Sequence, residues 1–197
     1  MRARRCVAPA GESAFGRAAG LELRTVCLHG PESTGKTTLA SELAEHFGTI
    51  AVPEYGRLYC EIFGNECDME DLRAIRRGHD LLAAAARRKA KGLIVFDTDA
   101  VMTAVWADVL LDQRPGDLDR IDDPADLYLL CDIDVPFVAD GIRYFPDQAM
   151  RAKMFAQTRR ELEHRNLPFV TVTGSRFVRL KTAVDAITAR FAELRAP

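Results

Sequence analysis

Short runs of apolar and β-branched residues alternate along this chain with longer segments whose apolar residues recur every three to four positions. The short runs predict buried strands at residues 23–29, 49–52, 92–97, 126–132 and 169–173. The longer segments predict amphipathic helices after residue 36 and at about 68–89, 101–110, 147–162 and 175–194. Residues 112–126 are rich in aspartate and predict a surface loop or a short helix. Strands and helices in this order indicate an α/β domain.

Aspartates mark where two of these helices begin. Asp68 is placed as an N-cap, with Asp71 three residues later, and Asp147 is placed at the start of the helix near 147–162. The last helix is expected to pack through the apolar residues Phe177, Leu180, Val184, Ile187 and Phe191.

The turn between the first strand and the first helix has the sequence GPESTGKT at residues 30–37, which fits the phosphate-loop pattern G-x-x-x-x-G-K-[ST]. Glycines let backbone N–H groups curl around phosphate oxygens, and the following helix points its positive end at the same anion. Lys36 is expected to reach the β- and γ-phosphates, and the Thr37 hydroxyl to bind Mg²⁺. The alternative is a glycine-rich turn that binds nothing. The strand–loop–helix setting favours binding of a nucleoside triphosphate, with ATP expected.

Acidic residues follow the next two strands, at the edge of the sheet where ligands bind in α/β proteins. Glu54, with Tyr55 and Arg57 beside it, follows the second strand, where a carboxylate can take a proton or hold magnesium through water. The alternative is a solvated loop with an ordinary Glu–Arg pair. Asp97 ends the third strand as in a Walker B segment, so it is expected to bind Mg²⁺ or act as a general base, with Asp99 close by.

Two later features are candidates for contacts with substrate. Trp106 lies two helical turns beyond Asp97, where its ring can stack on a substrate base or simply pack in the core. Residues 133–143 and the helix after them are expected to form a lid that excludes water and delivers arginine to the transferred phosphoryl group. Arg143 and Arg151 are the lid candidates, although a surface arginine is usually just solvated.

The composition of the chain limits which classes of partner it is expected to bind and in which cellular compartment it is expected. The chain has 197 residues and a formal net charge of -2, so no bulk charge favours nucleic acid or an anionic membrane. No apolar run approaches the roughly 20 residues that span a bilayer. Neither nucleic acid nor a membrane is therefore an expected partner. The five cysteines form no C-x-x-C pair, which indicates a reduced, cytoplasmic protein, and the scattered histidines argue against structural zinc.

The first 20 residues are rich in arginine, alanine and glycine and show no sustained period. They are interpreted as a flexible N-terminal extension, with a basic arm that contacts a partner as the alternative. Residues 21–197 are expected to form the nucleotide-binding domain.

Several motifs together resemble the ribosylnicotinamide kinase domain of NadR-type proteins, within the P-loop kinases. They are GPESTGKTTLA at 30–40, PEYGR at 53–57, FDTD at 96–99 with T-x-x-W at 103–106, and DGIR at 140–143. The resemblance covers about residues 23–194. It implies a five-stranded parallel sheet in the order 2-3-1-4-5, flanked by helices, with a lid. It also implies transfer of the γ-phosphate of ATP to the 5′-hydroxyl of nicotinamide riboside.

The resemblance also implies roles for individual residues. It assigns ATP binding to Lys36 and the loop backbone. Contacts to ATP are expected for Gly30, Glu32, Ser33, Thr34, Gly35, Lys36, Thr37 and Thr38, and for Arg151 from its lid position. It assigns Mg²⁺ binding to Thr37 and Asp97, and catalysis to Lys36, Asp97, Glu54 and Arg143. Asp97 resembles the base or the metal-organising acid, with Glu54 as its rival. Contacts to the nucleoside are implied for Glu54, Tyr55, Arg57, Asp97, Asp99 and Trp106.

The chain departs from full-length members of that family, because it lacks their helix-turn-helix and adenylyltransferase segments. A stand-alone kinase is therefore expected, and the departure leaves open whether the acceptor is another nucleoside or a nucleotide. The rival from another class is an ATP-binding regulatory module. The sequence leaves the oligomeric state open, and a homo-oligomer is compatible with it.

Overall fold

Five parallel strands form the central sheet of the computed structural model, which describes residues 22–137 and 147–194. The strands lie in the order β2-β3-β1-β4-β5, which confirms the predicted sheet. Their bounds are β1 Arg24–His29, β2 Ile50–Val52, β3 Leu93–Asp97, β4 Leu127–Cys131 and β5 Phe169–Val172. Leu28 of β1 lies opposite both Asp97 of β3 and Leu129 of β4. The carboxyl ends of the three central strands therefore meet at one edge of the sheet.

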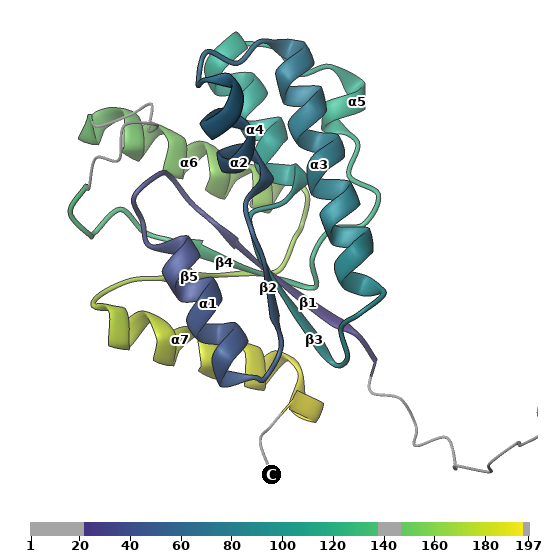
Figure 1. The fold of residues 1–197 in the computed structure, drawn as a ribbon. Helices are drawn as coiled ribbons and strands as arrows, with labels where there is room; N and C mark the ends of the chain where they lie inside the picture. The colour runs from purple at the N-terminus through teal and green to yellow at the C-terminus, as the bar shows by residue number, and fades with distance from the viewer. Residues whose placement is uncertain (1–21, 138–146, 195–197) are drawn as a thin grey trace, which may run out of the picture.

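Helices cover both faces of this sheet (Figure 1). On one face lie α1 (Lys36–His46) and α7 (Arg176–Arg190), and a 3-10 turn, η1 (Ala192–Leu194), follows α7. On the other face lie α3 (Met69–Arg87), α4 (Ala100–Leu111) and α6 (Gln148–His164). The short helices α2 (Tyr55–Phe63) and α5 (Gly116–Asp119) pack against α3 and α4 respectively.

Alternate residues of the strands supply the two cores of this three-layered structure. Val26 and Leu28 of β1 pack on the α1 side with Leu39, whereas Cys27 packs on the opposite side with Leu162 of α6. Every residue of β3 and β4 is buried. Helices on both faces explain why these strands are continuous apolar runs rather than alternating ones.

Both predicted aspartate caps are confirmed. Asp68 accepts hydrogen bonds from the backbone N–H groups of Glu70 and Asp71, and Asp71 accepts one in return from the Asp68 N–H at 2.8 Å. This reciprocal capping box fixes the start of α3. Asp147 caps α6 in the same way, through the N–H groups of Ala149 and Met150.

One helix was missed, and one expectation about packing is wrong. The sequence analysis did not predict α2, although its apolar residues recur at helical spacing, at positions 55, 58, 59, 62 and 63. Phe177 was expected to pack in the core but is 76% exposed. The buried position in the first turn of α7 is taken instead by Arg179, whose side chain bonds the loops around the phosphate site.

The expected N-terminal extension and residues 138–143 of the expected lid, which include Arg143, lie outside the described residues. Among the helices that the structure describes, none is both long enough and apolar enough to cross a bilayer.

Candidate active site

A cavity of about 390 Å³ opens at the carboxyl ends of the central strands, where ligands bind in α/β proteins. One wall is the phosphate loop, through Gly30 and residues 32–38, all of which line the cavity. Glu54 and Arg57 contribute from the start of α2. The remaining wall comes from α3, α4 and Thr98, which directly follows β3, whereas Asp97 itself does not line this cavity. The cavity thus brings together the phosphate loop and the segment after β2, which the sequence placed at the same site.

The phosphate loop is shaped by its glycines. Gly30 has a φ of 132°, and a Cβ there would lie 2.5 Å from the backbone oxygen of Cys131. Gly35 has a φ of 80° and is the N-cap of α1, and no side chain of the described residues caps this helix end. The first N–H groups of α1 therefore remain available to an anion. This cradle fits a phosphate chain, as the motif predicts.

Lys36 lies inside this loop with only 9% of the residue exposed. Its Nζ donates hydrogen bonds to the backbone oxygens of Gly30 and Pro31, each at 2.9 Å. The Thr34 hydroxyl donates to the same Pro31 oxygen at 2.8 Å. The ammonium group is thus held at the mouth of the anion cradle, within the loop that would carry the phosphates.

Glu54 is the N-cap residue of α2 and is half-buried beside the phosphate loop. Burial raises the pKa of its carboxyl to about 7, and the charges of Asp97 and Glu32 add to the rise, whereas Lys36 and Arg57 oppose it. A carboxylate with a pKa near neutral can accept a proton efficiently at physiological pH. This pKa is compatible with the role of base that the sequence left open between Asp97 and Glu54, and that role stays a prediction.

Asp97 ends β3 and is 2% exposed. Its Oδ1 atom has no hydrogen-bond partner among the described residues, an unusual state for a buried carboxylate oxygen. Thr37 offers a hydroxyl from the cavity wall. Hard oxygen atoms of this kind are the ligands that Mg²⁺ prefers, so both residues fit the predicted magnesium role.

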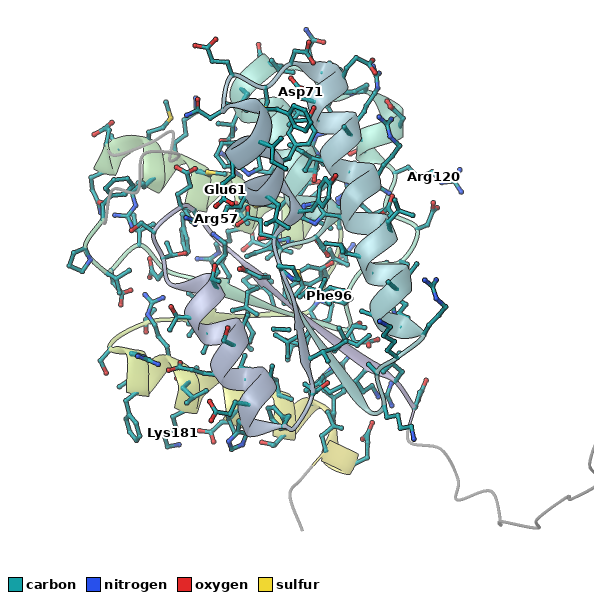
Figure 2. The ribbon with its side chains drawn as sticks, viewed as in Figure 1. Arg57, Glu61, Asp71, Phe96, Arg120 and Lys181 are labelled. Carbon is teal, nitrogen blue, oxygen red and sulfur yellow. The ribbon has the colours of Figure 1, made fainter. Side chains whose placement is uncertain are left out.

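Arg57 lies one turn into α2 and lines the cavity. Its Nε donates to Glu61 Oε1 at 3.3 Å, a contact between neighbouring turns of α2, and Figure 2 labels both residues beside this helix. The Glu–Arg pair weighed from the sequence joined Glu54 to Arg57. In the structure Arg57 pairs with Glu61, and the charges of Lys36 and Arg57 both lower the pKa of Glu54.

Tyr55 does not line the cavity. Its ring packs directly on α3 at Gly78, where a Cβ would lie 2.1 Å from Tyr55 Cδ1. Only glycine allows this close approach, so Gly78 fixes the position of the first turn of α2, which carries Glu54. The acceptor contact predicted for Tyr55 stays a prediction, because its ring serves here to join α2 to α3.

Replacement of Gly78 by alanine is expected to lower the free energy of unfolding by about 1–3 kcal/mol, because the new methyl group overpacks against Tyr55. Urea denaturation followed by circular dichroism measures the change. Gly116→Ala is the matched control, since nothing lies within 4 Å of a Cβ at that position. Equal stability of the two variants would contradict the packing role of Gly78.

Asp99 points away from the cavity, although it lies only two residues beyond Asp97. It is the N-cap of α4, and its carboxylate accepts hydrogen bonds from the Val101 N–H at 3.0 Å and the Tyr128 hydroxyl at 2.8 Å. Its Oδ1 also lies 2.9 Å from His29 Nε2. Burial alone would raise the pKa of Asp99, but these three partners hold it below its ordinary value. The predicted substrate contact of Asp99 stays a prediction, and its carboxylate borders a separate cavity of about 260 Å³.

The His29–Asp99–Tyr128 network was not predicted. It joins the end of β1 and the segment after β3 to Tyr128, the second residue of β4, and His29 and Tyr128 are both fully buried. Histidine, aspartate and tyrosine are separated by up to a hundred positions along the chain, so no local pattern signals that they meet.

Trp106 combines the two roles that the sequence left open. Its ring packs against the small cores around α4 and also lines the main cavity. The cavity wall around it is largely apolar, formed by Leu72, Ile75, Met102 and Leu110. This end of the cavity can therefore accept a flat ring, whereas the opposite end is lined by the phosphate loop.

Arg151 lies at the outer side of the phosphate loop and is 2% exposed. Its guanidinium donates to the backbone oxygens of Ser33 and Val135, each at 3.4 Å, and to Gln148 Oε1 at 3.0 Å. It does not line the main cavity, but it contacts the loop that would hold ATP. The predicted ATP contact of Arg151 stays a prediction.

A further cavity of about 320 Å³ lies on the other side of the phosphate loop, toward α7. Thr38, Pro136 and Arg176 are among the residues that line it. Arg176 thus places the start of α7 beside the phosphate loop. Arg179, which the sequence did not single out, donates to Thr34 O at 2.8 Å and to Gly174 O at 2.8 Å, and so ties the two loops together.

Comparison with known proteins identifies a family and relatives with similar sequences. A family model described as an AAA domain matches residues 25–179. The trifunctional NAD biosynthesis/regulator protein NadR of Escherichia coli (strain K12) is 31% identical over 167 residues, which cover 80% of this chain and 41% of that protein. NadR of Salmonella typhimurium (strain LT2) is 30% identical over 156 residues, covering 76% and 38%. The chain spans about two fifths of the length of these curated relatives.

Solved structures share the fold. A NadR protein in complex with NR superimposes with a TM-score of 0.71 and 25% identity, covering 86% of this chain and 52% of that one. A NadR protein in complex with NAD and AMP-PNP gives a TM-score of 0.71 at 24% identity, covering 88% and 51%. Thymidylate kinase from Ehrlichia chaffeensis gives 0.63 at 15% identity, covering 83% and 98%, which is a likeness of fold alone.

Proposed function

The chain belongs to the AAA domain family, and on this premise we propose that it is an ATP-dependent kinase for the 5′-hydroxyl of nicotinamide riboside. One observation carries the proposal: Glu54, with a pKa of about 7, faces the same cavity as the phosphate loop. A triphosphate in the loop and an alcohol beside Glu54 would then meet across a short gap. A binding protein that only senses ATP does not need a base at that place.

Each group of cavity residues has a separate role in the proposed phosphoryl transfer. The loop amides and Lys36 hold the triphosphate and offset the charge that spreads over the transferred phosphoryl group. Glu54 accepts the proton of the attacking hydroxyl. Asp97 and Thr37 would hold Mg²⁺, which when bound neutralises charge on the phosphate oxygens. The apolar wall around Trp106 excludes water and orients the acceptor ring.

Nicotinamide riboside is proposed as the acceptor because of the charged and aromatic residues that line the cavity, and because of the proteins to which this chain is similar. The riboside carries a cationic pyridinium ring, and Trp106 and the carboxylates of Glu32 and Glu54 line the cavity. A cation is attracted both to an aromatic face and to carboxylates. The NadR relatives include a protein solved with NR. A cytoplasmic location belongs to this proposal as well.

The experiment that tests the proposal is a coupled assay of ADP release with a panel of nucleosides that includes nicotinamide riboside. We expect release that depends on the acceptor and is fastest with this riboside. If ADP were released faster with another nucleoside, that nucleoside would replace nicotinamide riboside as the proposed acceptor. ATP binding without acceptor-dependent release from any nucleoside would instead favour a regulatory module.

Trp106→Ala is expected to raise the KM for the riboside by about tenfold with a smaller change in kcat, because it removes the aromatic wall and the cation–π attraction. Initial rates over a range of riboside concentrations measure both constants. An unchanged KM together with a lower melting temperature would mean that Trp106 is only a core residue.

A further inference from the structure

The side chain of Arg179 joins three loops at the carboxyl edge of the sheet. Arg179 lies in the first turn of α7 and is 5% exposed. Its guanidinium donates to the backbone oxygens of Thr34 and Gly174, each at 2.8 Å, and of Asp132 at 3.0 Å. These oxygens belong to the phosphate loop and to the segments that follow β5 and β4. One buried group therefore connects three segments that are far apart in the sequence.

Asp134 holds this guanidinium in one orientation. Its carboxylate pairs with Arg179 and also accepts a hydrogen bond from the Gly174 N–H at 2.5 Å. A planar guanidinium presents its N–H donors in fixed directions, so bonds on several sides leave it little freedom to turn. Because a carboxylate already offsets its charge, Arg179 is better suited to hold a loop than to attract an anion from a distance.

The bond to Thr34 sets the direction of the peptide group between Thr34 and Gly35. This peptide is trans, and in a planar trans peptide the C=O and the N–H point in opposite directions. Since the Thr34 oxygen points to Arg179, the Gly35 N–H points away from it. Gly35 lines the main cavity, and the N–H groups of such a loop are the groups that bind phosphate oxygens. Arg179 thus fixes the direction of one N–H group of the cradle.

Gly35 explains why this peptide group needs an anchor. Its φ is 80°, and a residue without a Cβ adopts φ of either sign at little cost. Without an anchor the peptide before Gly35 could turn over and present its oxygen to the anion in place of its N–H. Arg151 contacts the preceding peptide in a similar way, because its guanidinium donates to Ser33 O at 3.4 Å.

We propose that Arg179 is a positioning residue for phosphate binding, which orients the Thr34–Gly35 peptide so that its N–H donates to a phosphate oxygen of the nucleotide. The inference rests on the proposed function, in which this loop holds a triphosphate. It adds a residue that lies 145 positions beyond Thr34, outside the phosphate-loop motif. A reversed peptide would weaken binding twice, because a donor is lost and a carbonyl oxygen faces the anion.

The test measures the binding of inorganic tripolyphosphate and of ATP, each with magnesium, by isothermal titration calorimetry. In Arg179→Met we expect both Kd values to rise by the same factor, about tenfold to a hundredfold, because the two ligands share the phosphate chain. Arg179 also lines the cavity of about 320 Å³ beside the phosphate loop, so a direct contact with the base is the alternative. A higher Kd for ATP with an unchanged Kd for tripolyphosphate would show such a contact and overturn the inference.

Arg179→Lys separates orientation from charge and is the second variant if Arg179→Met does not fold. Lysine keeps the positive charge and a long stem but has no planar fork, so it cannot bond all three loops at once. We expect the Kd for tripolyphosphate to rise in this variant as well. A Kd equal to that of the parent chain would mean that charge alone is needed, and Arg179 would not be a positioning residue.

A spectroscopic measurement follows the N–H group itself. In the parent chain the amide proton resonance of Gly35 should move downfield when tripolyphosphate is added, because the N–H then donates to a charged oxygen. This shift should be lost in Arg179→Met and reduced in Arg179→Lys. Equal shifts in all three chains would contradict the proposed role.

Arg114→Met is the matched control. The Arg114 guanidinium also pairs with several segments, through Asp108, Asp119 and Glu161, but none of these residues belongs to the phosphate loop. We expect this variant to lose stability and to keep both Kd values. If Arg179→Met behaved in the same way, with a lower melting temperature and unchanged Kd values, its role would be structural only and the inference would fail.

Failure of this inference and failure of the proposed function give different results. Acceptor-dependent ADP release by the parent chain, with unchanged Kd values in the Arg179 variants, would overturn only the present inference. Phosphate binding that depends on Arg179, without ADP release from any nucleoside, would overturn only the kinase proposal.

Discussion

Lys36→Ala is expected to lower kcat by at least about a thousandfold, because it removes the fixed positive charge at the phosphate site. In the structure the ammonium group is buried and donates to two backbone oxygens of its own loop. The substitution therefore removes both the charge and two contacts that shape the cradle. Coupled ADP release at saturating ATP and riboside measures the loss.

Lys181→Ala supplies the matched control for this experiment. Lys181 is exposed on α7 and pairs with Asp185 one turn away, and Figure 2 shows it far from α2 and the labelled Arg57. We expect full activity in this variant. If Lys36→Ala folded normally and had the same kcat as Lys181→Ala, the phosphate loop would have no role in catalysis.

The phosphate loop and the sheet could be predicted because their signals are local. Gly30, Gly35 and Lys36 lie within one short segment, and covalent geometry alone brings them together. The strands β3 and β4 are buried on both faces, so each is a short, continuous apolar run. The capping box at Asp68 is equally local, since both partners lie within one helical turn.

The division of labour between neighbouring acids could not be predicted from the sequence. Asp97 and Asp99 have similar surroundings along the chain, and both were expected at the substrate. The positive φ of Thr98 separates them, and nothing in the sequence signals it, because glycine is the residue expected at such a position. The bond from Asp99 to Tyr128 spans 29 positions and is visible only in the folded chain.

The helix α2 illustrates a second limit. Its apolar residues recur at helical spacing, so the helix itself could have been predicted, but its position against α3 could not. Its place is set by the contact between Tyr55 and Gly78, which depends on the packing of two helices. Since α2 begins at Glu54, the same contact also sets the position of the proposed base.

Glu54→Gln is expected to lower kcat by about a hundredfold to ten-thousandfold, because an amide cannot accept the proton of the acceptor hydroxyl. In the parent chain kcat/KM should rise with pH through about 7, since Glu54 must be deprotonated to act and its pKa is about 7. In Glu54→Gln this dependence should disappear. Initial rates between pH 5.5 and 8.5, a range set by that pKa, measure the profile.

In Glu54→Gln the stability of the fold should rise while the activity falls. This difference distinguishes the loss of a catalytic base from unfolding of the chain. The pKa of Glu54 rises from 4.5 to about 7 on folding, so the native chain holds a proton that the unfolded chain has released. The contribution of Glu54 to stability is therefore complete below pH 4.5 and is lost as the pH rises through about 7. Glutamine stays neutral, so Glu54→Gln should be the more stable chain at pH 8 while being almost inactive.

Asp97→Asn completes the comparison between the two candidate bases. If Asp97 holds the metal, this variant should lose rate but keep the dependence on pH through 7, with a higher magnesium requirement. Loss of that dependence in Asp97→Asn, with its retention in Glu54→Gln, would transfer the role of base to Asp97. The charge of Asp97 raises the pKa of Glu54, so the two carboxylates are coupled. The pH profiles of both variants are therefore needed to assign the proton acceptor, because neither rate alone is enough.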